Sequence, residues 1–517
     1  MIIGQRFTRL RVAQALLALA ALCVSVATLE TLVHSRGEAG FEWVNHDVAN
    51  ILYLGKRMLA GDRLYTDLAE TNPPGIFYLA ESIAAVAAAT QVSQVFVFDA
   101  FVVLLALFGL WLIQRLYARA DRPLELSLVG GAFLLVFSGC GLPGDRMLAA
   151  CFGQREHLFA LAFIPYLLWR LSGQPLSTAA WLISGAVGFL ASMKPHFAIL
   201  VVALELCCWS EDRLTLRRVW PVLIAAAVLP YALLLLNSPA SLATFFRETI
   251  PLHTGGSYAY FDQPYSLFLH SAQHVWLVVY GVAIGYALWS GAQLSRAARR
   301  TVYLLPPLAY ALIVQQHKFW DYHAIVLESL LAVLSAYLGA ALIARLPAER
   351  AVPLFGLLMA ALALGNWRAV AELRAMTGDW KHGIGVDARL MKVAPLLRGR
   401  RRVLYYSTSI SHMQLALLLG QRTVGRWSHD LLYPSLVRAA DPARRPRLLA
   451  QYCAEQQQLI ATQKPDAVVF HSTRQGLESR EQELFSQLVE RCKVIPELEY
   501  SAVFPEKVPG VAVFLRR

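Results

Sequence analysis

Charged side chains are scarce in this sequence. Of its 517 residues, 16% are Asp, Glu, Lys or Arg, whereas 57% are hydrophobic. A soluble globular domain carries about 25% charged residues, so the composition argues against a soluble protein. The mean hydropathy of +0.47 and repeated apolar runs of about 20 residues instead predict a chain that crosses a membrane many times.

Cysteine and histidine patterns typical of zinc sites are also absent. The seven cysteines form no CxxC pair, and the sequence contains no HExxH, which argues against zinc sites of these two kinds. Cys453 and Cys492 lie in the polar C-terminal part, where an exported domain would permit a disulfide between them. We find no internal repeat and no low-complexity tract.

The net charge of +12 comes from short basic clusters between the apolar runs. Lys and Arg are enriched in loops on the cytoplasmic side of a membrane, so this charge does not indicate nucleic-acid binding. The first run, 12–33, is longer than the core of a signal peptide and ends without a clean cleavage site. It is therefore interpreted as a retained first transmembrane helix.

The apolar runs predict a mainly α-helical membrane protein with about eleven spans. These are 12–33, 95–115, 124–142, 157–171, 177–193, 195–210, 219–236, 271–290, 302–315, 323–343 and 352–368. The segment 76–92 is short, carries Glu81 and follows two prolines, so it fits an interfacial helix as well as a twelfth span. If it lies on the surface and the N-terminus is cytoplasmic, every basic cluster between spans falls inside, which the positive-inside rule favours.

With this topology the polar motifs gather on the outer face. The chain divides into a membrane module, 1–369, whose first external loop is 34–94, and a soluble α/β domain, 370–517, on the outer face. In that domain we expect strands at 402–407 and 466–470 and helices at 412–420 and 480–492. A basic cluster at 397–402 weighs slightly against an outer position.

An NHD triplet opens the first external loop. Partial burial at the membrane boundary would raise the pKa of the Asp47 carboxyl and suit it to act as a general base. Asn45 and His46 could hold this carboxylate, and Asp67 and Glu70 follow in the same loop. The alternative is an ordinary solvated loop carboxylate.

Cations, histidines and a tyrosine occupy the outer ends of three other helices. They are Arg155, His157, Lys194, His196, Lys318, Tyr322 and His323. Snorkelling side chains and an interfacial aromatic belt are the structural alternatives. An anion is the natural ligand of Arg and Lys, and the phosphate of a lipid would lie at this depth. A divalent metal ion held by Asp47 and that phosphate is a further alternative.

The external loop 237–270 contains two glycines and several tyrosines. Tyr258 and Tyr260 could stack on a sugar ring. An ordinary long loop is the alternative, although long loops in compact proteins are often functional.

The order of one membrane helix, an acidic residue opening a large external loop, LYTDLAETNPPGIFYL, more helices and an outer domain resembles the GT-C superfamily. Its members are integral-membrane glycosyltransferases. The similarity is greatest to the bacterial branch related to protein O-mannosyltransferases and lipid A aminoarabinose transferases. It covers the layout of residues 1–370 and is sharpest at 61–79 and 318–323.

The resemblance implies that Asp47 is the catalytic acidic residue. It also implies a bacterial inner-membrane enzyme that takes sugars from polyprenyl-phosphate carriers on the outer face. The triplet NHD replaces the DE pair of the mannosyltransferases, so a different acceptor is expected. The C-terminal domain resembles nothing that would assign its role.

The sequence therefore predicts transfer of a sugar from a polyprenyl-phosphate-linked donor to a lipid, glycan or protein acceptor. Asp47 would be the base, the anomeric centre would invert, and Arg155, Lys194 and Lys318 would stabilise the departing phosphate. No cofactor is required by the pattern. A transporter or lipid flippase is the first alternative, but Glu205, inside a span, has no evident basic partner. An O-antigen polymerase or ligase and a non-catalytic assembly protein are the others.

Overall fold

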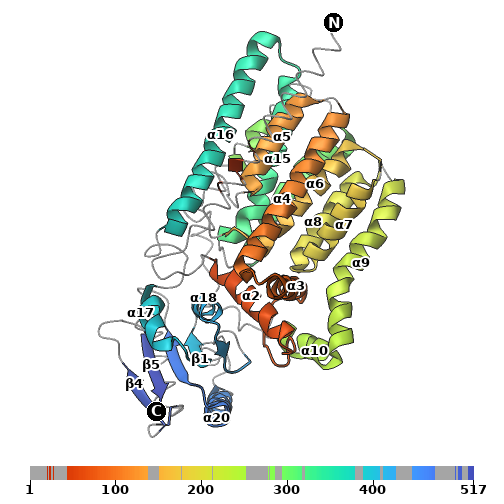
Figure 1. The fold of residues 1–517 in the computed structure, drawn as a ribbon. Coiled ribbons are helices and arrows are strands. Elements are labelled where there is room, and N and C mark those ends of the chain that lie inside the picture. The colour runs from red at the N-terminus through yellow and green to blue at the C-terminus, as the bar shows by residue number, and fades with distance from the viewer. Residues whose placement is uncertain are drawn as a thin grey trace.

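The protein is a helical bundle with a small sheet at one end (Figure 1). The computed structural model describes residues 44–120, 122–137, 151–175, 177–211, 213–251, 280–285, 294–316, 321–378, 388–407, 411–426, 445–471, 499–503 and 511–517, with a few isolated positions. The predicted combination of a mainly helical fold and a C-terminal part with mixed helices and strands is confirmed.

Long apolar helices form the bundle. They are α4 (Gln94–Arg119), α5 (Pro123–Phe137), α6 (Arg155–Ser172), α7 (Thr178–Ala191), α8 (Pro195–Cys208), α9 (Arg213–Asn237), α14 (Arg296–Gln316), α15 (Ile325–Ile343) and α16 (Ala348–Gly378). Each overlaps a span predicted from the sequence. The predicted spans 12–33 and 271–290 lie largely outside the described residues.

Four segments of the described chain are long and apolar enough to cross a membrane. They are Gln94–Arg119, Arg217–Asn237, Tyr322–Ile343 and Glu349–Arg368. The apolar helices α5, α7 and α8 are shorter. The figure of eleven spans therefore stays a prediction.

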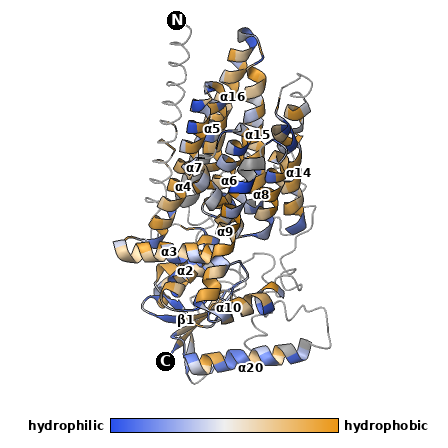
Figure 2. Ribbon diagram, turned by 90° about the vertical axis from the view of Figure 1, so that its right-hand side faces the viewer, coloured by the Kyte–Doolittle hydropathy of each residue, from blue (hydrophilic) through white to orange (hydrophobic). Residues whose placement is uncertain are grey.

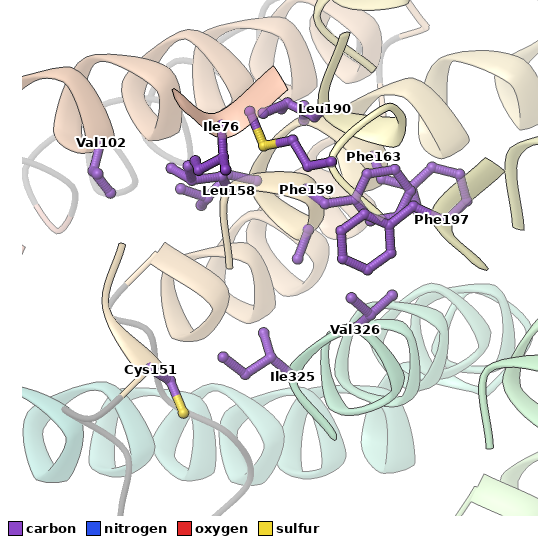
Figure 3. Packing of buried hydrophobic residues seen from close by; sticks show 14 of the residues in the cluster. Ile76, Val102, Cys151, Leu158, Phe159, Phe163, Leu190, Phe197, Ile325 and Val326 are labelled. Atoms are coloured by element: carbon purple, nitrogen blue, oxygen red, sulfur yellow. The ribbon is translucent and has the colours of Figure 1, made fainter. Parts of the chain in front are cut away.

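Helix α6 runs through the centre of the bundle. Its Phe159 ring stacks on Phe197 of α8, with 4.3 Å between ring centroids, and on Phe163 one turn along α6, at 4.9 Å (Figure 3). Helices α7 and α9 also pack closely. A Cβ atom on Gly188 of α7 would stand 2.4 Å from the Leu223 carbonyl oxygen of α9. Glycine here lets the two backbones approach closely, as is common between membrane helices.

Two helices of the segment predicted to form the first external loop lie across the end of the bundle rather than along it (Figure 2). They are α2 (His46–Leu59) and α3 (Gly75–Thr90). A Cβ atom on Gly55 of α2 would stand 2.4 Å from the Ala80 carbonyl carbon of α3, so glycine permits their crossing. Whether α3 lies on the membrane surface or spans it stays a prediction. The short α10 (Pro239–Thr244) and the π-helix η2 (Phe245–Thr249) follow α9 at the same end.

The C-terminal part contains a five-stranded sheet with strand order β2-β1-β3-β5-β4. Its strands are β1 (Arg402–Ser407), β2 (Arg422–Thr423), β3 (Ala467–His471), β4 (Tyr500–Val503) and β5 (Val511–Arg516). Strands β2 and β3 pair parallel to β1, whereas β5 pairs antiparallel to both β3 and β4. The predicted strands 402–407 and 466–470 coincide with β1 and β3.

Helices cover both faces of this sheet. They are α17 (Ala388–Leu397), α18 (Ser411–Leu418) and α20 (Arg445–Gln463). Leu404 on β1 packs with Ile460 of α20, whereas Val403, on the opposite face, belongs to the same core as Met413 of α18. The predicted helix 412–420 corresponds to α18, and the one at 480–492 lies outside the described residues. The domain boundary at 370 stays a prediction, since α16 continues to Gly378.

One buried ion pair corrects an expectation. Arg170 on α6 donates from Nε to Glu205 on α8 at 2.9 Å, and the Tyr166 hydroxyl donates to the same Oε1 atom at 2.5 Å. The expectation that Glu205 has no basic partner is therefore wrong. Arg170 and Glu205 are 35 residues apart in the sequence, so only the packing of α6 on α8 reveals the pair.

Candidate functional site

Asp47 occupies the first turn of α2. The Asn45 side chain caps this helix, because its Oδ1 accepts the backbone N–H groups of Asp47 at 2.8 Å and Val48 at 3.4 Å. An N-cap amide and an acidic first turn are both favourable at a helix N-terminus. The Asp47 side chain is 18% exposed, so the cap fixes a carboxylate that solvent or a ligand can still reach.

Gln154, the residue before α6, holds this carboxylate from the bundle side. Its Nε2 donates to Asp47 Oδ2 at 2.7 Å and to Asn45 Oδ1 at 2.9 Å. The other carboxylate oxygen, Oδ1, lies 3.9 Å from His46 Nε2. Gln154 is fully buried, and its Oε1 has no hydrogen-bond partner among the residues that the structure describes. One oxygen of Asp47 is thus anchored, and the other faces His46.

Glu70 is a buried anchor of the same loop. It accepts hydrogen bonds from Asn50 Nδ2 at 3.0 Å, from the backbone N–H of Thr71 at 2.6 Å and from Asn72 Nδ2 at 3.0 Å. The Asn72 amide in turn accepts a hydrogen bond from the guanidinium of Arg155. Glu70 therefore orients Asn72, and through it the cation that starts α6.

Lys194 precedes the first residue of α8 and forms an ion pair with Glu156. Its ammonium lies 5.4 Å from the ring centroid of Tyr322, and His323 Nε2 lies 3.9 Å from the same Glu156 oxygen. Burial lowers the pKa of Lys194 to about 8, although the charge of Glu156 opposes this shift. The charges of Arg155 and Asp47 also act on the pKa of Lys194, so these groups form one electrostatic cluster.

Several predicted site residues are engaged elsewhere. Asp67 bonds Arg63 at 2.9 Å on the exposed side of the loop. His157 uses both ring nitrogens on backbone groups, the N–H of Gly153 at 3.0 Å and the carbonyl of Val136 at 2.9 Å. The ring of His196 is half-buried and meets the Phe197 ring edge-on. Lys318, Tyr258 and Tyr260 lie outside the described residues.

The sequence did not single out the neutral and acidic side chains that bind Asp47, Arg155 and Lys194. Gln154 and Glu156 flank Arg155 in GQREH, and Asn72 lies in the ETNPPG turn. One feature of the sequence could have indicated them, because GQREH lies where a polar loop leads into an apolar helix. In the structure each of its side-chain-bearing residues is buried.

Among the described residues, no group of three or more His, Cys, Asp or Glu side chains is placed to hold a metal ion. A divalent ion held by Asp47 together with a substrate phosphate needs fewer protein ligands and stays a prediction.

Over nearly the whole chain, the fold is similar to those of two solved membrane enzymes, ArnT and the oligosaccharyltransferase AglB. The resemblance predicted from the sequence is thereby confirmed for the fold. ArnT from Cupriavidus metallidurans bound to undecaprenyl phosphate aligns with a TM-score of 0.56 and 13% identity, covering 97% of each chain.

AglB, the oligosaccharyltransferase from Archaeoglobus fulgidus, in complex with an inhibitory peptide and a dolichol-phosphate, aligns with a TM-score of 0.51 and 12% identity. The match covers 98% of this chain and 74% of AglB. No protein-family model and no curated protein sequence matches the chain.

Proposed function

We propose that the protein is a glycosyltransferase that moves a sugar from a polyprenyl-phosphate-linked donor to a hydroxyl of a lipid, glycan or protein acceptor. Two structures with the same fold contain undecaprenyl phosphate and dolichol-phosphate. The observation that carries the proposal is the arrangement around Asp47. Gln154 anchors one carboxylate oxygen, the Asp47 side chain is 18% exposed, and the cations Arg155 and Lys194 belong to the same cluster.

In this proposal Asp47 Oδ1 accepts the proton of the acceptor hydroxyl. The acceptor oxygen attacks the anomeric carbon of the donor and forms the new glycosidic bond. The bond from that carbon to the phosphate oxygen breaks, and its electron pair leaves with the lipid phosphate. Attack opposite the leaving group inverts the anomeric centre.

The cations would stabilise the charge that grows on the departing phosphate. Arg155 presents N–H donors in a planar fork that suits phosphate oxygens. Lys194 is balanced by Glu156, so a bound phosphate would share this ammonium with Glu156 while the Tyr322 ring supports it. We propose that Lys318 joins them.

The remaining predicted residues receive narrower roles. His46, His196 and His323 would orient the donor and acceptor, and Tyr258 and Tyr260 would line the sugar. Asp67, Glu70 and His157 are engaged in hydrogen bonds within the protein. We propose that these three support the loop and the helix start without touching substrate.

The proposed location is the bacterial cytoplasmic membrane, with the N-terminus inside and the C-terminal sheet outside. The basic clusters between spans support this orientation. Cys453 is disulfide-bonded, and disulfides persist in oxidising compartments outside the cytosol.

A transporter or flippase is favoured by one observation, the Arg170–Glu205 pair within the bundle. Ionisable residues inside membrane segments often mark transport pathways. Such a protein would depend on Glu205 and would not need Asp47 as a base.

A transfer assay tests the proposal. Purified protein would receive radiolabelled polyprenyl-phosphate sugars and an envelope extract as acceptor. Asp47→Asn should lower the transfer rate by about 10²- to 10⁴-fold, the usual contribution of a general base. Asp67→Asn is the matched control, because it removes an exposed carboxylate of the same loop. Equal transfer by Asp47→Asn and wild type would reject Asp47 as the base.

A further inference from the structure

The C-terminal sheet and its helix α18 contact the first external loop next to Asp47 and Glu70 (Figure 1). Gln414 on α18 donates a hydrogen bond to the carbonyl of Val44, which precedes the N-cap of α2. The backbone N–H of Ala69, just before Glu70, donates to the Arg426 carbonyl at 2.5 Å. The two chain segments that carry the site are therefore tied to residues about 360 to 370 positions later.

Between these two points lies a buried polar junction. The Thr423 backbone N–H donates to the Tyr53 hydroxyl at 2.6 Å, and that hydroxyl donates to Thr423 Oγ1 at 3.0 Å. Arg57 Nη1 donates to the Thr423 carbonyl at 3.1 Å. Tyr53 and Thr423 are 2% and 6% exposed, so water does not compete for these bonds.

The rim of the contact is charged. Arg422 Nη2 donates to Asp62 Oδ1 at 2.8 Å, and Asp62 also pairs with Arg57. Arg426 Nη2 donates to the Tyr65 carbonyl at 2.9 Å. These bonds hold the turn that leads from α2 towards Glu70.

Apolar packing joins the same elements. Met413 and Ala416 of α18 belong to one continuous core with Val48 and Leu52 of α2. The sheet thus has no separate core on this face. It shares one with the helix whose first turn carries Asp47.

We propose that the C-terminal sheet is part of the transferase site and that Gln414 and Tyr53 are positioning residues for Asp47. The inference rests on the proposed function. The Val44 carbonyl precedes the N-cap Asn45, and the Val48 N–H is taken by the Asn45 side chain, so the bond from Gln414 fixes the chain just before α2. Losing the bond from Gln414 lets this start shift relative to Gln154, which is fixed at the start of α6. A displacement of about 1 Å at a catalytic group costs roughly 10²-fold in rate.

Two substitutions test this in the full-length protein. Gln414→Met keeps the side-chain length and removes the amide donor, and Tyr53→Phe removes only the hydroxyl. Each should lower kcat about 10- to 100-fold, while the KM for the polyprenyl-phosphate donor changes less than about threefold. Gln456→Met is the matched control. Gln456 accepts a hydrogen bond from Tyr406 at 3.0 Å within the C-terminal part, so its loss affects stability without touching the first loop.

A double-mutant comparison separates positioning from general destabilisation. If Gln414 acts through Asp47, Gln414→Met should lower the residual rate of Asp47→Asn by less than about twofold. The inference fails if Gln414→Met and Tyr53→Phe both retain the kcat of Gln456→Met, or if the effects of Gln414→Met and Asp47→Asn multiply. Full activity of Asp47→Asn would instead refute the proposed base, so the two failures are distinguishable.

Discussion

Helices α6 and α8 carry an ion pair at each of their ends, and the surroundings of the two pairs differ. Near the C-terminal ends, Arg170 and Glu205 have side chains only 2% and 1% exposed. Near the N-terminal ends, the side chains of Lys194 and Glu156 are 11% and 1% exposed, and they share a cluster with Asp47, whose side chain is 18% exposed. Burying a charge costs free energy, so each charge of the fully buried Arg170–Glu205 pair depends on the other for its stability. The Lys194–Glu156 pair instead lies beside a partly exposed carboxylate, where we propose that the reaction takes place.

Of the changes near these two ion pairs, removing the Gln154 side chain that anchors Asp47 should lower sugar transfer most. Gln154→Leu keeps the volume near that of Gln but deletes the donor to Asp47 Oδ2, so the carboxylate can turn away from the acceptor. We expect transfer to fall about 10- to 100-fold.

Gln174→Leu is the control at the other end of α6. It deletes a bond from Gln174 Nε2 to the Leu116 carbonyl at 2.8 Å and should leave transfer within about twofold, the usual range for a site remote from the chemistry. Similar losses in the two variants would show that any weakened end of α6 impairs transfer.

Raising the pH should have an intermediate effect. Burial lowers the pKa of the Lys194 ammonium to about 8. Its positive charge is therefore present below pH 8 and is lost as the pH rises through that value. Affinity for undecaprenyl phosphate should therefore weaken about tenfold between pH 7 and pH 9 if binding needs the charge. Titration calorimetry or native mass spectrometry measures this affinity.

Lys194→Arg sharpens the pH experiment. Arginine stays charged over this range, so the variant should show a nearly constant affinity. A wild type whose affinity does not change with pH would exclude Lys194 as a phosphate ligand.

Changing the buried Arg170–Glu205 pair should affect transfer least. Glu205→Gln leaves the Arg170 charge buried without its counterion, which costs about 3–5 kcal/mol of stability when one partner of a buried pair is removed. Transfer measured below the unfolding temperature should stay close to wild type. Thermal unfolding and the transfer assay are recorded on the same preparation, and a loss of transfer without a loss of stability would show that Glu205 takes part in the transfer reaction.

Much of the bundle could be predicted because apolar runs fix where membrane helices lie. The predicted spans 95–115 and 219–236 fall within α4 and α9. Strands β4 and β5 were not predicted, since they lack the continuous buried apolar run that marks β1 and β3. Their pairing with β3 depends on contacts far along the chain.

For the site, charge next to an apolar run singled out Asp47, Arg155 and Lys194. The amide Gln154 gave no comparable signal, because glutamine is common in any loop. The orientation of His157 depends on how far α6 is rotated about its axis. The sequence does not determine that rotation, and in the structure it directs the ring to the Val136 carbonyl.

The bond from Gln414 to Val44 spans 370 positions of the sequence. A ribosome adding about 5–20 residues per second needs about 20–70 s to make the intervening chain. In the proposed topology, the first external loop would by then be outside the membrane, without the partner that fixes its helix start. If the sheet positions Asp47, a half-made chain meets donor lipid with an unfinished site. Transfer then begins only when the last part of the protein has been exported and folded.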